Sequence, residues 1–400
     1  YSIKYYVDLA KELERTGAQI IGIKDMSGLL KPYAAKKLIK NLKEEVGVPI
    51  HLHTHDTTGN GVATILQATE AGVDIVDTAV NSMSGLTSQP ALNSVVAALK
   101  NTNRDTKIDL DKAEEISKYW AAVRPVYENF ESDLKSGTTE IYKYEIPGGQ
   151  YSNLKPQVES FGLGHKFKDV KEMYKSVNEM VGDIVKVTPS SKMVGDFAIF
   201  MVQNDLTPEN ILEKGKNLDY PDSVMTYFRG MMGQPYGGFP KDLQEMILKG
   251  EKEVTVRPGE LLEDEDFDKI KIHLEEKGIE PSEEDLISSA LYPKVFDDYI
   301  DYIKENGEVS RVGSDVFFHG LMEGETAEIS IEEGKTLIVT LIEIGKLLYD
   351  GTRNLTFEIN GSRRTVNIKD KTVKDSENDK DEKIYADPKN EKEIGSSIPG

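Results

Sequence analysis

The chain has 400 residues, with 70 acidic against 49 basic side chains and a formal net charge of −21. An acidic surface of this size argues against nucleic acid and anionic membranes as partners, because phosphate groups would be repelled. The absence of cysteine excludes disulfides and thiolate metal sites, and it permits a reducing compartment. The acidic excess is concentrated late, in stretches such as 260–268 and 375–383, which we interpret as solvated surface and linker.

No stretch approaches the roughly 18 consecutive apolar residues of a membrane span. The chain has no initiator methionine and no signal peptide, and it opens at Tyr1 within a helical pattern. We therefore expect a piece of a longer polypeptide. The length predicts roughly two to four domains, and the 38% of hydrophobic residues are enough for substantial cores.

Three helical patterns, each followed by a glycine and then by a strand pattern, fill the first ninety residues with a period of roughly 25. Gly17, Gly47 and Gly72 are expected to take the left-handed conformation that ends a helix. Alternating helices and strands predict an α/β fold with a parallel sheet and helices outside it. The helices are predicted at 5–15, 33–46 and 62–71, and the strands at 19–24, 49–55 and 74–80.

A parallel sheet of three or four strands would leave open edges and an uncovered face. We therefore predict that residues 1–100 are the C-terminal part of a (β/α)8 TIM barrel whose earlier strands precede Tyr1. Active sites of such barrels lie at the carboxyl ends of the strands. Lys24 ends the strand Ile20-Ile21-Gly22-Ile23-Lys24 and is expected to point inward there. The alternative is a buried lysine that only pairs with a carboxylate.

Half of the six histidines of the chain lie in His51-Leu52-His53-Thr54-His55-Asp56. A strand points alternate side chains to one face, so the three imidazoles project the same way. Neighbouring members of this set are about 7 Å apart at their Cα atoms, close enough to reach one metal ion. Gly59 and Gly61 follow, which places the histidines where a strand runs into a loop. The alternative is a polar strand end with solvated imidazoles.

Residues 101–308 are predicted to form a helical extension of the barrel domain. The loops at 147–150 and 233–238 are rich in glycine but lack phosphate-loop spacing, so we predict no nucleotide site there. The clearest helical patterns are 110–129, 169–181, 191–204, 222–230, 240–248 and 283–306.

Residues 309–370 are predicted to form a small antiparallel β domain. Four alternating segments are separated by turns, among them Asn360-Gly361, and Asn-Gly is the strongest short hairpin signal. Residues 371–393 are almost entirely charged or polar and are interpreted as a flexible linker. Residues 394–400 are expected to begin a further domain. The strands are predicted at 326–331, 336–344, 355–359 and 364–368.

Five motifs follow one another in the chain, and together they are highly specific. They are Lys24-Asp25-Met26-Ser27-Gly28, the His51–Gly59 segment, Asn81-Ser82-Met83-Ser84-Gly85, Pro147-Gly148-Gly149-Gln150-Tyr151 and Val187-Thr188-Pro189-Ser190-Ser191-Lys192. In order and spacing they resemble the carboxyltransferase region of the pyruvate carboxylase family. The resemblance covers nearly the whole chain, with residues 309–370 similar to that family's tetramerisation domain and 394–400 similar to the start of its biotin carrier domain.

The resemblance implies a metal site of two histidines, a carbamylated lysine and an aspartate. His53 and His55 match the histidine ligands, and Lys24 matches the lysine that is modified to N6-carboxylysine. An ammonium would repel a dication, whereas a carbamate is an anionic oxygen ligand. Nitrogen and oxygen ligands suit Zn²⁺ or Mn²⁺, and the sequence does not choose between them. The aspartate ligand and the pyruvate-binding residues are expected upstream of Tyr1, and His51 is expected to support the site without ligating.

Thr188 matches the catalytic threonine of the family. The resemblance implies that it carries a proton from the methyl group of pyruvate to the biotin enolate left when carboxybiotin loses CO2. A hydroxyl is a poor base alone, but here it gives one proton while it takes another. Lys192 matches a residue of the biotin pocket, and Ser191 and Gln150 are weaker candidates for that pocket. The alternative for residues 188–191 is a helix N-cap and nothing more.

The resemblance also implies the partners of the chain. They are pyruvate, carboxybiotin on a separate carrier domain, an upstream domain that uses ATP, and further copies in a homotetramer. The product would be oxaloacetate, and no nucleic acid or membrane is expected. The compartment would be the cytoplasm in a bacterium or the mitochondrial matrix in a eukaryote. The chain alone is expected to be inactive, because it would hold only part of the active site.

Three rival interpretations remain open at this point. The biotin-dependent oxaloacetate decarboxylase α subunit and the transcarboxylase subunit carry similar lysine and histidine motifs, although residues 309–370 and a charged linker favour pyruvate carboxylase. Metal-dependent condensing or lyase barrels acting on acyl-CoA use a similar His-x-His strand but lack the segments at 147–151 and 188–192. A non-catalytic role as an oligomerisation scaffold belongs to a different class.

Overall fold

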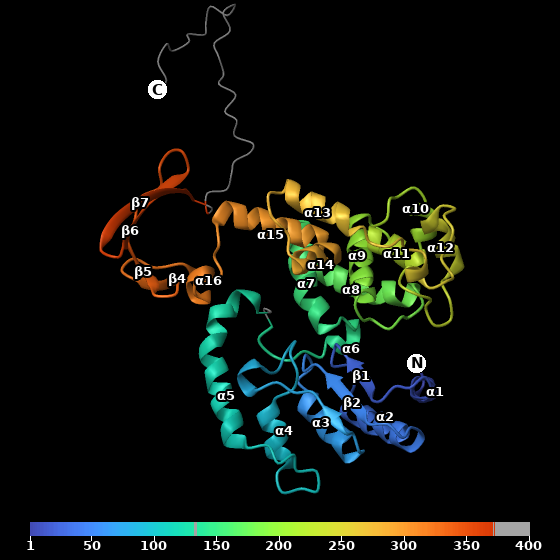
Figure 1. Ribbon diagram of the computed structural model, residues 1–400. Coiled ribbons are helices and arrows are strands. Elements are labelled where there is room, and N and C mark those ends of the chain that lie inside the picture. Colours follow the sequence, from blue (N-terminus) through green and yellow to red (C-terminus); the bar gives the residue numbers. More distant parts are fainter. Residues whose placement is uncertain (132–133, 371, 373–400) are drawn as a thin grey trace, which may run out of the picture. The chain divides into compact units, whose positions relative to one another are not determined.

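A computed structural model describes residues 1–131, 134–370 and 372 (Figure 1). The chain divides into two compact units, Tyr1–Glu265 and Asp266–Gly400. The boundary between them falls inside the predicted helical extension, and most of the predicted linker and all of residues 394–400 lie outside the described residues. Within the described part, no helix is both long and apolar enough to cross a membrane.

The first unit begins with a parallel sheet whose strands lie in the order β1-β2-β3. Lys24 is the register partner of His53, and His51 is the partner of Ile75. The elements are α1 (Ile3–Arg15), β1 (Ile21–Asp25), α2 (Pro32–Glu45), β2 (Ile50–Thr54), α3 (Gly61–Glu70) and β3 (Ile75–Val76). The alternation of helices with parallel strands is therefore confirmed.

The third strand is much shorter than the predicted 74–80. The Asp77 amide still donates to the Leu52 carbonyl, which continues the pairing by one bond. Beyond it the chain turns to another partner, because the Ala79 amide donates to the Pro90 carbonyl and the Leu92 amide donates to the Ala79 carbonyl. Residues 77–80 thus leave the sheet to pair with the segment that precedes α4 (Leu92–Leu99), a helix that the sequence did not predict.

One face of the sheet packs against α1, α2 and α3 (Figure 1). Ile50, Leu52 and Thr54 of β2 are buried on this face, while the intervening His51 and His53 are only partly buried. The predicted common face of the histidines is thereby confirmed. The core on the helix side consists of Ala10, Ile21, Ala35, Leu38, Ile39, Leu42, Val46, Ile50, Leu52, Ala68 and Val73.

The glycine prediction holds at two of its three positions. Gly17 and Gly72 have φ of +100° and +99°, the left-handed region that glycine enters without steric cost. At Gly47 the prediction is wrong, because α2 already ends at Glu45 and the next residue, Val46, is extended with φ −121°. The Gly47 amide instead donates to the Glu14 carboxylate at 2.8 Å, which ties the end of α2 to α1.

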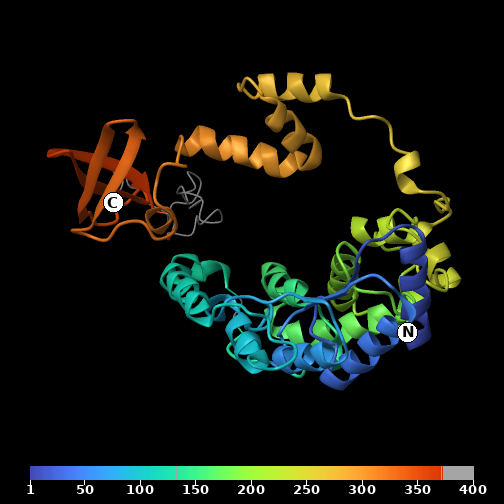
Figure 2. The same cartoon turned by 60° about the horizontal axis from the view of Figure 1, so that its bottom comes forward.

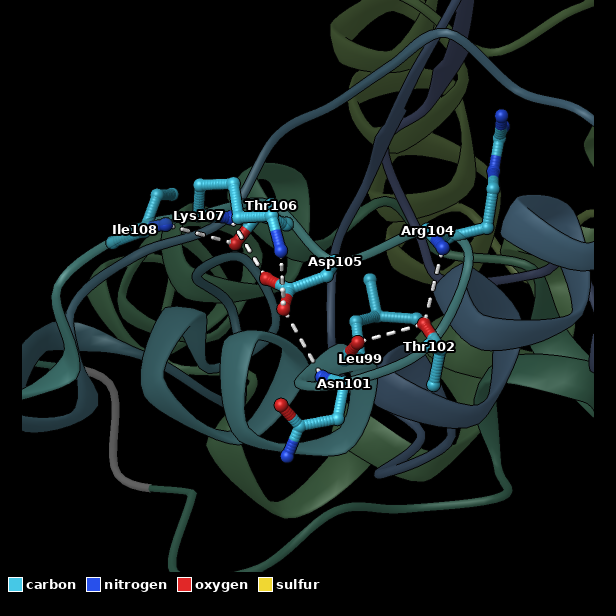
Figure 3. A network of polar contacts seen from close by, with 8 residues as sticks. All are labelled: Leu99, Asn101, Thr102, Arg104, Asp105, Thr106, Lys107 and Ile108. Atoms are coloured by element: carbon cyan, nitrogen blue, oxygen red, sulfur yellow. Dashed lines mark hydrogen bonds and ion pairs between the residues drawn. The ribbon is translucent and has the colours of Figure 1, made fainter.

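The loop between α4 and α5 (Leu110–Val123) is organised by one carboxylate, Asp105 (Figure 3). Asp105 accepts from the amides of Asn101 and Lys107 at 3.0 and 2.9 Å and from the Lys107 ammonium at 3.1 Å. These hydrogen bonds, that of the Lys107 amide first, lower the pKa of Asp105 to about 2. The predicted helix 110–129 is shorter than expected, since Pro125 follows its end and the chain continues as a 3₁₀ helix, Arg124–Phe130.

A helical core forms the rest of the first unit, with Tyr174, Phe197 and Phe228 fully buried at its centre. The glycine-rich segment at 147–150 is a helix start, not the predicted loop, since α7 begins at Gly148 directly after Pro147. Two glycines in the first turn and Pro156 inside the helix are unfavourable for a helix, which is why the sequence pattern did not indicate α7. The helices are α6 (Ile141–Tyr144), α7 (Gly148–Ser160), α8 (Phe167–Met180), α9 (Ser190–Gln203), α10 (Ile211–Lys214), α11 (Asp222–Phe228) and α12 (Lys241–Leu248).

In its described residues the second unit contains four helices and a four-stranded antiparallel sheet, β4-β5-β6-β7, that is strongly curved in both views (Figures 1 and 2). Asn360 and Gly361 have φ of +47° and +78°, as a type I′ hairpin turn requires, so this turn is confirmed. The predicted helix 283–306 is two helices, because Pro293 begins the second. The elements are α13 (Phe267–Glu276), α14 (Glu283–Leu291), α15 (Pro293–Asn306), α16 (Ser314–His319), β4 (Thr326–Glu332), β5 (Lys335–Ile344), β6 (Thr352–Ile359) and β7 (Ser362–Lys369).

Candidate active site at the carboxyl ends of the parallel strands

The loop after β1 is fixed by Asp25, the last residue of that strand. Its carboxylate accepts from the amides of Leu29 and Leu30 at 2.9 and 3.0 Å and from the Thr54 hydroxyl at 2.8 Å. The turn presses against the next strand at Gly28, where a Cβ would lie 2.5 Å from the His55 carbonyl oxygen and φ is +69°. Glycine is required at this position, and the backbone at His55 is held rigidly from the side of β1.

His51 and His53 share one carboxylate, that of Asp77, directly after β3. His51 Nε2 lies 2.8 Å from Asp77 Oδ1, and His53 Nδ1 lies 2.7 Å from Asp77 Oδ2. An ionised carboxylate only accepts hydrogen bonds, so both ring nitrogens must carry protons. His51 therefore orients Asp77, and Asp77 orients His53, as the supporting role expected for His51 requires.

His55 is oriented in the same way by a backbone carbonyl. Its Nδ1 lies 2.6 Å from the Thr87 oxygen, which can only accept. With both Nδ1 atoms protonated, neutral His53 and His55 each keep a lone pair on Nε2. These two Nε2 atoms face one another at 3.2 Å. Two lone pairs at this distance repel unless a cation or a proton lies between them.

The separation of the two nitrogens fits a shared metal ion. Two nitrogens about 2.1 Å from one ion lie about 3.0 Å apart at a right angle and about 3.4 Å apart at the tetrahedral angle. The observed 3.2 Å falls between these values. The Asp77 and Thr87 contacts are the outer hydrogen bonds that metal-binding histidines normally make. The geometry is thus suited to a divalent ion of either tetrahedral or octahedral preference.

Lys24 lies opposite His53 in the register of β1 and β2. Its side chain is exposed, and among the described residues it has no hydrogen-bond or ion-pair partner. Within the described residues Lys24 is therefore neither buried nor paired with a carboxylate. An unpaired ammonium on the face that carries His53 and His55 is free to be modified or to contact a ligand.

The electrostatics of this end of the sheet favour neutral imidazole. Burial lowers the pKa of His55, and the charges of His53 and Lys24 lower it further, against the hydrogen bond to Thr87. Burial works to raise the pKa of Asp77, but the hydrogen bonds from His51 and His53 outweigh it, so the pKa is lowered. A neutral His55 beside an ionised Asp77 is the protonation state that metal binding needs. Burial raises the pKa of the neighbouring Asp56, whose carboxylate accepts from the Gly61 amide at 2.7 Å.

The ligand set within the described residues is incomplete. They hold no group of three or more His, Cys, Asp or Glu side chains that could bind a metal. Two imidazoles and a carbamylated Lys24 would supply three ligands, and the expected aspartate ligand stays a prediction.

Thr188 lies directly before α9, in the helical part of the same unit. It is exposed, and its side chain makes no hydrogen bond to any residue that the structure describes. The N-cap of α9 is Pro189, and the hydroxyl of Ser190 bonds to the backbone of Val187 at 2.6 Å. Thr188 therefore does not cap the helix, and the interpretation of this residue as an N-cap is wrong.

The three residues predicted for a biotin pocket gather around α9. Ser191 is buried in the first turn, Lys192 is exposed beside it, and Gln150 reaches α9 from α7 with its amide against Gly195. These residues and Thr188 form one group, and Lys24, His53 and His55 form another. Backbone and side-chain bonds join the two regions, from the Thr138 amide to Thr57 at 2.8 Å and from Asn60 to the Tyr142 hydroxyl at 3.0 Å.

Asp77 is the residue that sequence reasoning missed. It lies in the middle of the predicted strand 74–80, but it directly follows the strand that the structure has, Ile75–Val76. Functional residues of such sheets collect at the carboxyl ends of the strands, but the sequence placed this end after residue 80 and so gave no signal at Asp77. Thr87 carries no comparable signal, because its contribution is a backbone carbonyl.

Two family models match different parts of the chain. A family model described as HMGL-like matches residues 1–119, and the conserved carboxylase domain model matches residues 141–340, half of the chain. The chain belongs to the conserved carboxylase domain family. The HMGL-like match over the parallel sheet confirms the predicted α/β fold with part of a TIM barrel.

Individual members of this family are similar over the whole chain. The pyruvate carboxylases of Bacillus subtilis and Staphylococcus aureus are each 52% identical over 401 aligned residues, which is 100% of this chain and 35% of those proteins. The structure of the carboxyl transferase domain from Rhizobium etli pyruvate carboxylase with pyruvate and biocytin is 46% identical, with a TM-score of 0.84. That match covers 93% of this chain and 63% of the solved one. The chain corresponds to the carboxyltransferase region and spans about a third of these curated relatives.

Proposed function

We propose that this chain is part of the carboxyltransferase of a biotin-dependent pyruvate carboxylase, which moves CO2 from carboxybiotin to the enolate of pyruvate and forms oxaloacetate. The observation that carries the proposal is the pair of Nε2 atoms of His53 and His55, 3.2 Å apart at the carboxyl end of β2. The identity of 52% to pyruvate carboxylases and the Rhizobium etli structure with pyruvate and biocytin support it.

We propose that His53, His55 and a carbamylated Lys24 hold a divalent metal, Mn²⁺ or Zn²⁺. The bound ion would act as a Lewis acid that stabilises negative charge on the enolate oxygen. The protein's own part is to keep both Nε2 atoms unprotonated, through Asp77 and Thr87, and to bring the anionic oxygen of Lys24 to the same place. The register of Lys24 with His53 supports this assignment.

Thr188 is proposed as the catalytic group that moves the proton. Its hydroxyl takes a proton from the methyl group of pyruvate while its own proton passes to the biotin side, so no free alkoxide accumulates. The exposed hydroxyl, which is committed neither to capping α9 nor to a described neighbour, supports this role. Lys192, Ser191 and Gln150 are proposed to line the pocket for biotin.

The wider organisation is proposed on the same grounds. Because the chain spans 35% of the matched relatives, we place it within a longer polypeptide that also carries an ATP-using domain and the biotin carrier. The proposed parts are 1–100 (barrel), 101–308 (helical extension), 309–370 (tetramerisation domain), 371–393 (linker) and 394–400 (start of the carrier). A homotetramer is proposed. The proposed compartment is the cytoplasm in a bacterium or the mitochondrial matrix in a eukaryote, since one relative is named the mitochondrial pyruvate carboxylase of Rattus norvegicus.

The proposal is tested with Thr188 variants of the full-length protein. Thr188→Ala removes the hydroxyl and is expected to abolish oxaloacetate formation from pyruvate, whereas Thr188→Ser keeps the hydroxyl and retains activity. Metal content by elemental analysis and the melting temperature are expected to be unchanged in both, because Thr188 is exposed and its side chain makes no hydrogen bond to a described residue. Full activity of Thr188→Ala would refute the proton-transfer role.

A further inference from the structure

We propose that Gly195 and Asp196, two consecutive residues of α9, are positioning residues that fix the side chains of Gln150 and Lys192 for binding of the biotin ring system. This inference rests on the proposed function, which places Gln150 and Lys192 in the biotin pocket. It adds two residues that act through them and that the sequence did not single out.

Asp196 is the meeting point of three helices. Its carboxylate is only 10% exposed, and it accepts from Lys192 Nζ at 2.6 Å and from the Ser223 hydroxyl of α11 at 2.7 Å through Oδ2. Oδ1 accepts from Gln157 Nε2 of α7 at 3.0 Å. A carboxylate so far removed from water needs compensating donors, and Lys192 is the cation among these three.

The consequence for Lys192 is a fixed direction. Its side chain remains 65% exposed although its ammonium is bound to Asp196. The lysine precedes the acidic residue by four positions, which is the less favourable order for a pair that merely stabilises a helix. The contact is therefore better understood as holding one face of the ammonium while the other faces stay open to a ligand carbonyl or carboxylate.

Gly195 fixes the second side chain by leaving room for it. A Cβ at this position would lie 2.6 Å from Gln150 Nε2, closer than such atoms approach, and 3.5 Å from Leu154 Cδ1. The Gln150 amide therefore lies directly on the α9 backbone, where any other residue would place its side chain. Glycine in a helix interior is unfavourable, so this close approach is the structural reason for it here.

Both contacts come from one face of α7. Gln150 and Gln157 are seven residues apart, which is two helical turns, and they meet Gly195 and Asp196 respectively. The docking of α7 on α9 thus sets the positions of Gln150 and Lys192 together. Disturbing either positioning residue should change the affinity for biotin without changing the metal site.

The test uses the full-length protein and free biocytin as the carboxyl acceptor from oxaloacetate. Gly195→Ala should raise the KM for biocytin roughly three- to tenfold, the loss of about one hydrogen bond, with kcat and metal content nearly unchanged. Its melting temperature should not fall, because alanine favours helix and only the mobile end of Gln150 must move. Asp196→Asn should raise the same KM, and Asp196→Glu should restore part of it.

Double-mutant cycles separate positioning from simple structural damage. If Gly195 acts through Gln150, then Gly195→Ala adds little to the KM effect of Gln150→Ala, and Asp196→Asn likewise adds little to that of Lys192→Met. Should Gly195→Ala unfold the protein, the Asp196 cycle alone decides. Additive effects on the KM overturn this inference. An unchanged KM in the Gly195 and Asp196 variants also overturns it, if Gln150→Ala and Lys192→Met raise the KM. Either result leaves the proposed function standing. If Gln150→Ala and Lys192→Met are themselves without effect, the assigned biotin pocket is wrong and this inference fails with it.

Discussion

The two ends of the parallel sheet contain similar polar side chains, but those at the amino end pair with one another, whereas two at the carboxyl end repel each other. At the amino end, Asp74 accepts from Lys43 and from the Ile50 amide, both at 2.8 Å, and Arg104 donates to the Val73 carbonyl at 2.6 Å. At the carboxyl end, the hydrogen bonds of Asp77 and Thr87 leave two Nε2 lone pairs facing each other at 3.2 Å.

The difference teaches which end the protein uses for chemistry. Asp74 and Asp77 flank the same short strand, Ile75–Val76, and the pKa of each is lowered by its donors against the effect of burial. One carboxylate completes a closed network that stabilises the fold. The other orients His53 for a ligand, as the Thr87 carbonyl orients His55, and the two imidazoles are left in a repulsive contact. Such local conflicts within an otherwise consistent structure are expected at functional sites.

The largest expected effect on this comparison is the loss of metal from histidine variants. His55→Ala removes one of the two converging nitrogens, so the full-length protein should lose nearly all of its bound divalent metal. The matched control is His273→Ala in the second unit, where His273 Nε2 also contacts a carboxylate, that of Asp297 at 2.9 Å, and should leave metal content unchanged. Elemental analysis measures both. Equal metal content in His55→Ala and the parent would show that the ligands are misassigned.

An intermediate effect is expected from removing the negative charge of Asp77, the residue that follows β3. In Asp77→Asn the amide can accept from only one of His51 and His53 and turns a donor toward the other, and the negative charge is lost, so the tautomer of His53 is held less firmly. Metal affinity should fall by roughly 10- to 100-fold, the usual size of such outer-contact effects.

Asp74→Asn is the matched control for that change at the other end of the same strand. It should lower the free energy of unfolding by roughly 1 kcal/mol, since it weakens the Lys43 pair and one backbone bond, with metal affinity unchanged. Metal titration and urea unfolding of both variants provide the comparison. If the two variants lose metal affinity equally, the two ends of the sheet do not differ in the way described.

How much of this site the sequence predicts depends on how far apart in the sequence the interacting residues lie. Strand periodicity places His51, His53 and His55 on one face, because the alternation of side chains is a local property. The contact of Asp77 with two of them joins residues 24 and 26 positions apart, and no local pattern encodes it. The same holds for the contacts of Asp196 with Gln157 of α7 and Ser223 of α11, 39 and 27 positions away.

The fold shows the same dependence on sequence separation. Helix and strand types in the first ninety residues follow from local patterns, and the Asn360-Gly361 turn follows from the left-handed preference of its two residues. The length of β3 does not, because it is set by competition with the segment at 89–92, which pairs with Ala79. The start of α7 at Gly148 was masked by glycines that are unfavourable in helices but are tolerated when tertiary packing supports them.

The smallest expected effect concerns the loop at the amino end that Asp105 organises (Figure 3). The pKa of Asp105 is about 2 in the folded protein, below the value of about 3.9 for an unfolded aspartate. A lowered pKa stabilises the fold at neutral pH, and this stabilisation is lost as the pH falls from about 4 toward 2. Asp105→Asn should therefore lower the melting temperature at pH 7, with a difference from the parent that narrows below pH 4. A pH-independent difference would contradict a charge-based role.

The most direct measurement is an anomalous difference map of the full-length protein in crystals, recorded on both sides of the zinc and manganese absorption edges. The account predicts one peak within bonding distance of both His53 Nε2 and His55 Nε2, with density for a carboxylated Lys24 reaching the same peak. Nε2 atoms that diverge, no anomalous peak between them and an unmodified Lys24 directed elsewhere would contradict it.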